Sequence, residues 1–143
     1  MKRVTWRILL KTATRLHIGV YRASGGRIAG KAWGLQILLL TTTGRKSGKR
    51  RTTPLCYLTD GGSFVVVASN GGMDWYPAWW LNLSHSPHAT IEVGNAKFAV
   101  RSRAATPVEH KRLWAEITAL APGYLRYEER TERKIPLGIL EPL

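Results

Sequence analysis

The chain of 143 residues has one cysteine, no acidic residue before Asp60 and no long apolar run. Because Cys56 has no partner thiol, an intramolecular disulfide is excluded, and so are the cysteine clusters of structural zinc sites. The longest aliphatic run, residues 37–40, is far too short to cross a bilayer, so we expect no transmembrane helix. The histidines are isolated or separated by Ser86-Pro87, so we expect no metal site. The length and an apolar content of 44% predict a single folded domain.

The lack of acidic residues in the first third makes the charge one-sided. The formal net charge is +13, and residues 1–51 hold 13 of the 22 lysines and arginines. Residues 52–143 hold 9 basic and 9 acidic residues and are therefore neutral. Such a field favours a polyanionic ligand, nucleic acid or an anionic membrane surface. Composition does not choose among these three.

Residues 1–20 predict a basic amphipathic helix. Side chains four apart form a basic stripe: Arg3, Arg7, Lys11 and Arg15. Another face is apolar: Trp6, Leu9, Leu10, Ala13 and Leu16. No cleavage site of small residues follows, so a secretory signal is not expected. The helix either packs on the remaining domain, residues 21–143, or binds a membrane surface, and both are compatible.

The rest of the chain alternates apolar runs with turn signals. After a glycine-rich loop at 21–30, strands are predicted at residues 35–40, 54–58, 63–69, 89–93, 97–104 and 135–140. Helices are predicted at 78–83 and 107–120, the second starting from a capping box formed by Thr106 and Glu109. Many consecutive strands with few helices favour a mainly β, α+β fold, built as a small antiparallel barrel.

The basic segment at residues 44–51, GRKSGKRR, is the sharpest local motif. It is not a P-loop, because its glycines are one residue too close and Arg50 replaces the required Ser or Thr. Glycine lets backbone N–H groups approach an anion, and arginine offers paired donors to phosphate. The alternative is a solvated hairpin tip. Nucleic acid is disfavoured, because the segment has no aromatic side chain on which a base could stack.

Two later segments suit a planar ligand. Residues 68–72, ASNGG, end a strand in a loop whose hydroxyl, amide and backbone donors could hold a heterocycle, although most such ends are plain turns. Trp79 and Asn82 are three apart and would share a helix face. Tyr124 and Tyr127 have the same spacing, and phenols serve better as proton donors than as bases. The charged residues around them predict a solvated ion-pair face: Arg126, Arg130 and Arg133 with Glu128, Glu129 and Glu132.

Four motifs in order resemble the deazaflavin-dependent nitroreductase family: YRASGGRIAG, LLLTTTGRKSGKRRTTPL, FVVVASNGGMDWYPAWWLNL and YLRYEERTERKIPLGILEP. Members are actinobacterial-type oxidoreductases that use the 8-hydroxy-5-deazaflavin coenzyme F-420. The likeness extends from Tyr21 to the C-terminus. It implies a split β-barrel of antiparallel strands with an N-terminal helix and flanking helices. The coenzyme has a phosphodiester and an oligoglutamate tail, which fits the basic first third.

The resemblance also implies site residues. It places the coenzyme phosphate at Arg45, Lys46, Ser47 and Arg51, with Gly48 and Pro54 in the same cofactor site. It places the deazaflavin ring and linker at Val67, Ala68, Ser69, Trp79 and Asn82. The implied catalytic residues are Ser69, Tyr124 and Tyr127, with Tyr124 the preferred proton donor.

The implied reaction is hydride transfer from the reduced coenzyme to a quinone, a nitro compound or an activated enone such as a coumarin or aflatoxin. A separate dehydrogenase would regenerate the reduced coenzyme. The expected location is cytoplasmic, with peripheral binding to the inner face of the membrane through residues 1–20 as an open alternative. Two other readings remain: the same barrel holding FMN or haem, and a non-enzymatic basic module for nucleic acid or an anionic membrane.

Overall fold

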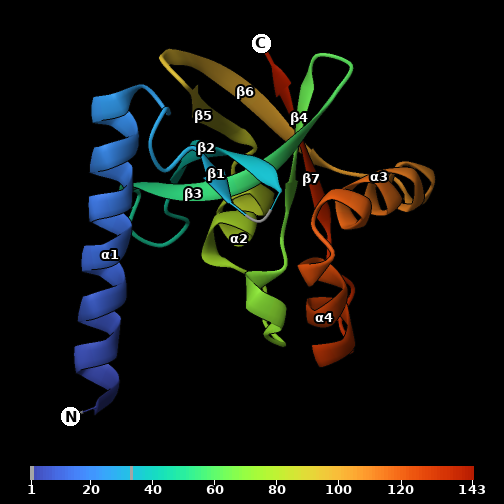
Figure 1. Cartoon of the computed structure of the whole chain (residues 1–143), viewed down its shortest axis with the longest axis horizontal. Helices are drawn as coiled ribbons and strands as arrows, with labels where there is room; N and C mark the ends of the chain where they lie inside the picture. Colours follow the sequence, from blue (N-terminus) through green and yellow to red (C-terminus); the bar gives the residue numbers. More distant parts are fainter. Residues whose placement is uncertain (1, 33) are drawn as a thin grey trace.

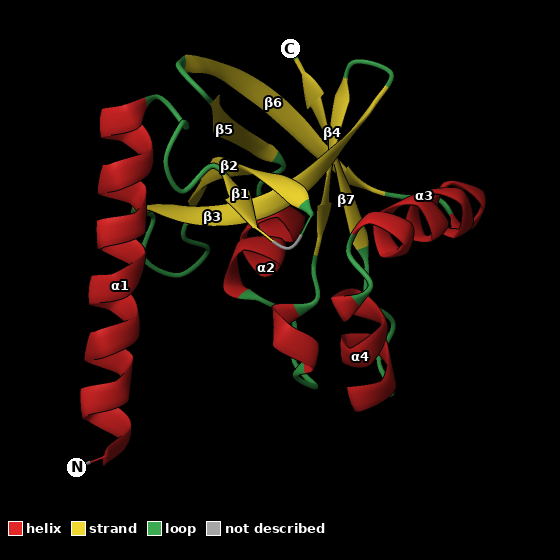
Figure 2. Cartoon of the chain, viewed as in Figure 1, coloured by secondary structure: helices red, strands yellow, loops and turns green. Residues whose placement is uncertain are grey.

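The computed structural model describes residues 2–32 and 34–143 (Figure 1). Its helices are α1 (Lys2–Ser24), α2 (Ala78–His85), α3 (Pro107–Leu120) and α4 (Gly123–Arg130), with a 3-10 turn η1 (Asn70–Gly72). Its strands are β1 (Lys31–Ala32), β2 (Leu35–Thr43), β3 (Arg50–Asp60), β4 (Ser63–Val67), β5 (His88–Val93), β6 (Ala96–Ala104) and β7 (Leu137–Pro142). The strands gather at the centre and the helices lie around them (Figure 2).

The strands close into a six-stranded antiparallel barrel. Neighbours follow the order β2-β3-β4-β7-β6-β5, and β5 pairs again with β2. The short β1 forms a hairpin with β2 outside this ring. The predicted mainly β, α+β barrel is confirmed. Closure leaves the main-chain groups of the six strands paired on both sides, which stabilises so small a barrel.

The apolar run in β2 explains why this strand is central. Residues 37–40 are at most 6% exposed, because β2 is covered on both faces. Leu38 and Leu40 belong to the core inside the barrel, whereas Ile37 and Leu39 pack outside it against Tyr21. Alternation along a strand sends successive side chains to opposite faces, so a strand buried on both faces is apolar throughout.

Helix α1 continues beyond its predicted end. We expected a loop from Tyr21, but the helix runs to Ser24 and the chain turns at Gly25 and Gly26, both with positive φ. Tyr21 is 1% exposed, and its hydroxyl donates to the carbonyl of Ile37 at 2.9 Å and accepts from the Gly94 N–H at 2.9 Å. The expected boundary between residues 20 and 21 therefore falls inside α1, whose last turns pack on the barrel.

The polar residues 41–53 are mostly strand rather than loop. β2 extends to Thr43 and β3 begins at Arg50, so the hairpin loop is only residues 44–49. β-Branched threonines suit paired strands, and Thr41 and Thr52 join their hydroxyls across the pair at 2.8 Å. Strand β4 ends two residues earlier than expected, at Val67, and the last strand begins at Leu137 rather than Ile135.

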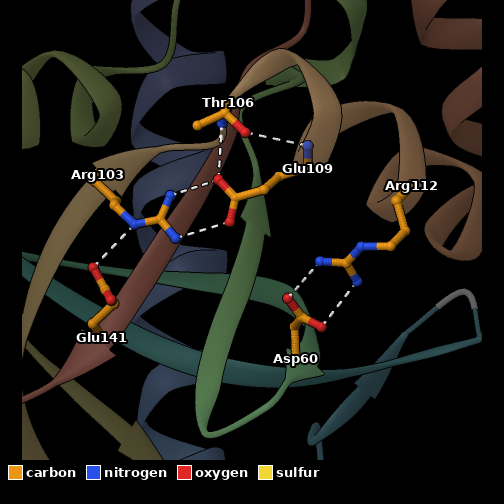
Figure 3. Close-up of polar contacts among 6 residues, drawn as sticks. All are labelled: Asp60, Arg103, Thr106, Glu109, Arg112 and Glu141. Carbon is orange, nitrogen blue, oxygen red and sulfur yellow. Dashed lines mark hydrogen bonds and ion pairs between the residues drawn. The ribbon is translucent and has the colours of Figure 1, made fainter.

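Helix α3 is attached to the barrel by ion pairs (Figure 3). Arg103 on β6 donates to both oxygens of Glu109, at 2.7 and 2.9 Å, and to Glu141 on β7 at 3.1 Å. Arg112 donates to both oxygens of Asp60 at the β3–β4 turn, each at 3.0 Å. Charge-assisted bonds favour the ionised carboxylates, so Arg103 lowers the pKa of Glu109 to about 2 and Arg112 lowers the pKa of Asp60.

The predicted capping box of α3 is present. The Thr106 hydroxyl accepts from the Glu109 N–H at 3.3 Å, and the Glu109 carboxylate accepts from the Thr106 N–H at 3.0 Å. Pro107 follows as the first helical residue. Glu109 thus caps the N-terminus of α3 and also pairs with Arg103 on β6. These contacts fix where α3 begins and where it lies against β6.

Candidate active site

A cavity of about 670 Å³ lies between α1, the 44–49 loop and α2. Its volume is in the usual range for small-molecule sites. Cationic side chains come from two elements: Lys11 and Arg15 from α1, and Arg45, Lys46, Arg50 and Arg51 from the β2–β3 hairpin. None of the described lining residues is acidic. Positive charge concentrated without counter-charge makes this a site for an anion.

Asn82 fixes Arg45 at the cavity wall. The Asn82 side chain is buried, at 4% exposure, and its Oδ1 accepts from the Arg45 backbone N–H at 3.2 Å and from Arg45 Nη1 at 3.1 Å. Its Nδ2 donates to the Thr42 hydroxyl at 3.1 Å. One buried amide therefore ties α2 to Thr42 at the end of β2 and to Arg45, the first basic residue of the 44–49 loop. Arg45 is held ready for an anion without being neutralised by a carboxylate.

The loop itself is a tight closed turn. The Gly44 N–H donates to the carbonyl of Lys49 at 2.7 Å, and the Gly48 N–H donates to the carbonyl of Gly44 at 2.8 Å. A Cβ on Gly44 would lie 2.7 Å from the Ser47 hydroxyl, so a larger residue would open the turn. Gly48 has φ +70, which favours glycine, and its N–H is used inside the loop. The glycines shape the loop, and Arg45, Lys46 and Ser47 of the same loop line the cavity.

Most of the predicted phosphate set comes together in this cavity. Arg45, Lys46, Ser47 and Arg51 line it, as do Trp79 and Asn82 from the predicted ring set. Gly48 lies at the exposed tip of the loop, and Pro54 follows Thr53, which lines the cavity from β3. The sequence analysis did not place side chains of α1 in the cofactor site. Lys11 and Arg15, which line the cavity, belong to the basic stripe predicted for residues 1–20.

The end of β4 connects this cavity to the tyrosines. Val67, Ala68 and Ser69 are all buried, at most 8% exposed. Ala68 shares the inner core with Trp79, whereas Val67 faces the second core, against which Tyr124 and Tyr127 pack. Val67, at the end of β4, and the next residue, Ala68, thus belong to different clusters: Val67 to that of the tyrosines and Ala68 to that of Trp79.

Tyr124 and Tyr127 form an edge-to-face pair on α4. Their ring centroids are 5.9 Å apart, and Tyr124 lies 6.3 Å from the ring of Trp114. Burial, together with the neighbouring Cys56, raises the pKa of Tyr124 well above its ordinary value. The phenol of Tyr124 is therefore protonated at neutral pH and can donate a hydrogen bond.

The predicted ion-pair face around α4 is wrong for Arg133. Its guanidinium donates to the main-chain carbonyls of Ala68, Ser69 and Met73, at 3.2, 2.8 and 2.9 Å. Arg133 therefore joins the linker that follows α4 to the segment that follows β4. The alternating charges of this segment could not predict this contact, because its acceptors are main-chain carbonyl groups far away in the chain.

Three comparisons with known proteins bear on this site. A sequence model described as F420H(2)-dependent quinone reductase matches residues 13–142. An F420H(2)-dependent quinone reductase of Mycobacterium tuberculosis (strain ATCC 25618 / H37Rv) is 39% identical over 130 residues, which cover 88% of this chain and 87% of that protein. A solved F420-H2 dependent reductase, FDR-A, is 34% identical with a TM-score of 0.67, covering 73% of this chain and 93% of that one. A haem-binding protein of Mycobacterium smegmatis, at 18% identity and a TM-score of 0.58, covers 83% of this chain and 50% of that one and shares the fold alone.

Proposed function

The chain belongs to the F420H(2)-dependent quinone reductase family, and from this membership we propose how its residues divide the work. The protein is an oxidoreductase whose reductant is F420H2 and whose acceptor is a quinone. An FMN- or haem-dependent barrel and a non-enzymatic basic module are therefore set aside. When bound, the reduced coenzyme supplies the hydride, and the chain supplies binding, orientation and a proton.

The cavity beside the 44–49 loop is the proposed coenzyme site. The observation that carries this is a cationic wall, without a described acidic residue, on which Arg45 is held by the buried Asn82. Guanidinium groups match phosphate oxygens in pairs, and the further cations of α1 and the hairpin suit a carboxylate-rich tail. Trp79, 6% exposed, adds an apolar surface at the same wall. The donor set fits a polyanion that carries an aromatic ring.

Ser69, Tyr124 and Tyr127 are proposed to face the acceptor. Hydride addition to a quinone leaves an oxygen that needs a proton, and the neutral phenol of Tyr124, which packs against the core that contains Val67, can donate to that oxygen. Tyr127 packs edge-on against Tyr124 and fixes its ring. Ser69 lies two residues after β4, next to Ala68 and before the η1 turn, and its hydroxyl is proposed to hold the acceptor carbonyl.

A fluorescence titration tests the coenzyme site. Tryptophan emission of the protein is followed with added F-420 and, in parallel, FMN, because Trp79 lies in the cavity wall. The Arg45→Ala, Lys46→Ala double variant should weaken F-420 binding by at least about 10-fold, the loss expected for one charge-assisted hydrogen bond or more. A matched variant, Lys97→Ala with Arg101→Ala, removes the same charge from exposed positions of β6. Equal affinities for the two double variants would contradict the site.

We also propose that the start of α1 binds an anionic bilayer, where a lipid-soluble quinone would be found. Ile8 and Leu9 are 59% and 57% exposed, and the first half of the helix projects beyond the barrel (Figure 1); Leu16, further along, is 68% exposed. The side chains of Arg3, Trp6 and Arg7, also predicted for this helix, lie outside those that the structure describes. Apolar and basic side chains on one helix suit an interfacial position. Within residues 2–32 and 34–143, no helix has the length and apolar character to cross a membrane.

Vesicle sedimentation tests this second proposal. The Ile8→Ser, Leu9→Ser variant should lose binding to vesicles of phosphatidylcholine and phosphatidylglycerol. Val108→Ser is the control, since Val108 is 81% exposed on α3, away from α1. Undiminished sedimentation of the α1 variant would count against the membrane role and leave the coenzyme site untouched.

A further inference from the structure

Arg133 lies in the linker between α4 and β7, and its guanidinium reaches the backbone that follows β4. Nε donates to the carbonyl of Met73 at 2.9 Å, and Nη2 donates to the carbonyl of Ser69 at 2.8 Å. Nη1 donates to the carbonyls of Ala68 at 3.2 Å and Lys134 at 3.1 Å. The planar fork thus joins both ends of the turn that begins at Ser69.

This turn has an unusual backbone conformation. Asn70, Gly71 and Gly72 follow one another with φ values of +47, +63 and +80. Asn70 adopts the left-handed region, which asparagine tolerates better than most residues, and its Nδ2 donates to the Trp75 carbonyl at 3.1 Å. Arg133 supplies support at the carbonyls on either side, and its Cζ also lies 4.8 Å from the ring centroid of Tyr76. The place of Ser69 therefore depends on Arg133.

The same turn holds α4, which lies beside it (Figure 1). A Cβ on Gly72 would lie 3.0 Å from Tyr127 Cα and 3.2 Å from its carbonyl oxygen, so the two backbones touch. The Thr131 hydroxyl donates to Asp74 Oδ1 at 3.0 Å. In α4, whose residues are all described, no side chain is fully buried. Contacts with this turn, which Arg133 joins at both ends, therefore help to set where this helix sits.

We propose that Arg133 is a positioning residue for the reductase reaction: it fixes Ser69 and the tyrosines of α4 relative to each other. The inference rests on the proposed function, in which Ser69 and Tyr124 face the acceptor. Lysine cannot replace it, because an ammonium group is a single point charge and cannot reach three separated carbonyls as a planar fork does. The coenzyme phosphate site, on the 44–49 loop, is outside this set of contacts.

The test compares Arg133→Gln and Arg133→Lys with Arg126→Gln, which removes a charge from an exposed position of α4. Hydrogen exchange of the coenzyme-free protein should be at least about 10-fold faster at residues 69–75 and 123–130 in both Arg133 variants, because several hydrogen bonds that close these segments are lost. Exchange at residues 107–120 should not change. With saturating F420H2 and a quinone, kcat per bound coenzyme should fall at least about 10-fold, a larger factor than any rise in the dissociation constant for F-420.

Each outcome has a distinct meaning. Unchanged kcat per bound coenzyme in Arg133→Gln, or full recovery in Arg133→Lys, would overturn the positioning role, because a purely structural residue alters only the fraction of active protein. If Arg133→Gln does not fold, Gly72→Ala replaces it: the added methyl group presses on Tyr127 and should lower kcat in the same way without a change in charge. A wild-type protein that binds no F-420 would instead refute the proposed function.

Discussion

The buried amide of Asn82 offers the sharpest test of the coenzyme site, through the substitution Asn82→Ala. The change removes two hydrogen bonds that hold Arg45 and one that holds Thr42. At about 1 kcal/mol net for each bond in a buried setting, the free energy of unfolding should fall by about 2–3 kcal/mol. For a chain of this size that corresponds to a melting temperature lower by about 6–9 °C. Affinity for F-420 should fall at least about 10-fold, because Arg45 is released from the cavity wall.

Calorimetry and the fluorescence titration measure these two effects on the same samples. Ser84→Ala is the matched control, since Ser84 is exposed on the same helix and its hydroxyl bonds only to the carbonyl of Trp80 among the hydrogen bonds of the described residues. Asn82→Asp separates the two effects: it keeps the acceptor for Arg45 but adds a negative charge to the cavity, so stability should largely recover while coenzyme affinity does not. Wild-type affinity in Asn82→Ala would refute the idea that this amide prepares Arg45 for an anion.

Three other predictions follow from particular contacts. Tyr124→Phe should lower kcat with a quinone by at least about 10-fold at unchanged F-420 affinity, and steady-state kinetics showing equal kcat would remove the proton-donor role. The pKa of Glu109 is lowered to about 2 in the folded protein, so its contribution to stability is present above its unfolded pKa of about 4.3 and is lost as the pH falls toward 2; thermal melts of Glu109→Gln should therefore differ from wild type at neutral pH and converge with it in acid. Tyr21→Phe leaves the Gly94 N–H without its partner, which should cost about 1–3 kcal/mol in chemical denaturation and leave F-420 affinity intact; an unchanged denaturation midpoint would show that the end of α1 is not part of the domain.

Local patterns explain why the barrel and the basic loop could be predicted. Alternation and turn signals identify strands such as 97–104, and glycine with arginine identifies an anion-binding loop. The closure of β2 onto β5 could not be predicted this way, because pairing between distant strands depends on the whole fold. Tyr21 was misplaced for a related reason: it precedes a glycine-rich segment, but buried partners on β2 and the β5–β6 turn extend the helix past it.

In the candidate active site too, some features could be predicted from the sequence and others required the fold. Residue chemistry marked the segment 44–51 as a candidate anion site and the family resemblance selected Arg45 and Arg51, whereas the role of Asn82 as the support of Arg45 required the fold. Arg133 is the clearest failure, since its segment alternates glutamates with basic residues and its partners include carbonyl oxygens more than sixty residues earlier. Main-chain acceptors leave no trace in the amino-acid sequence, so contacts of this kind appear only in three dimensions.

Helix α1 has one further consequence. Its Lys11 and Arg15 line the proposed coenzyme cavity, while Ile8, Leu9 and Leu16 are exposed on the same helix. A bilayer that holds this helix in place would also hold one wall of the cavity. If the helix held in this way favours the coenzyme, thermodynamic reciprocity makes the coenzyme favour membrane binding by the same factor. The reduced coenzyme would thereby recruit the protein to the membrane, where the acceptor is dissolved.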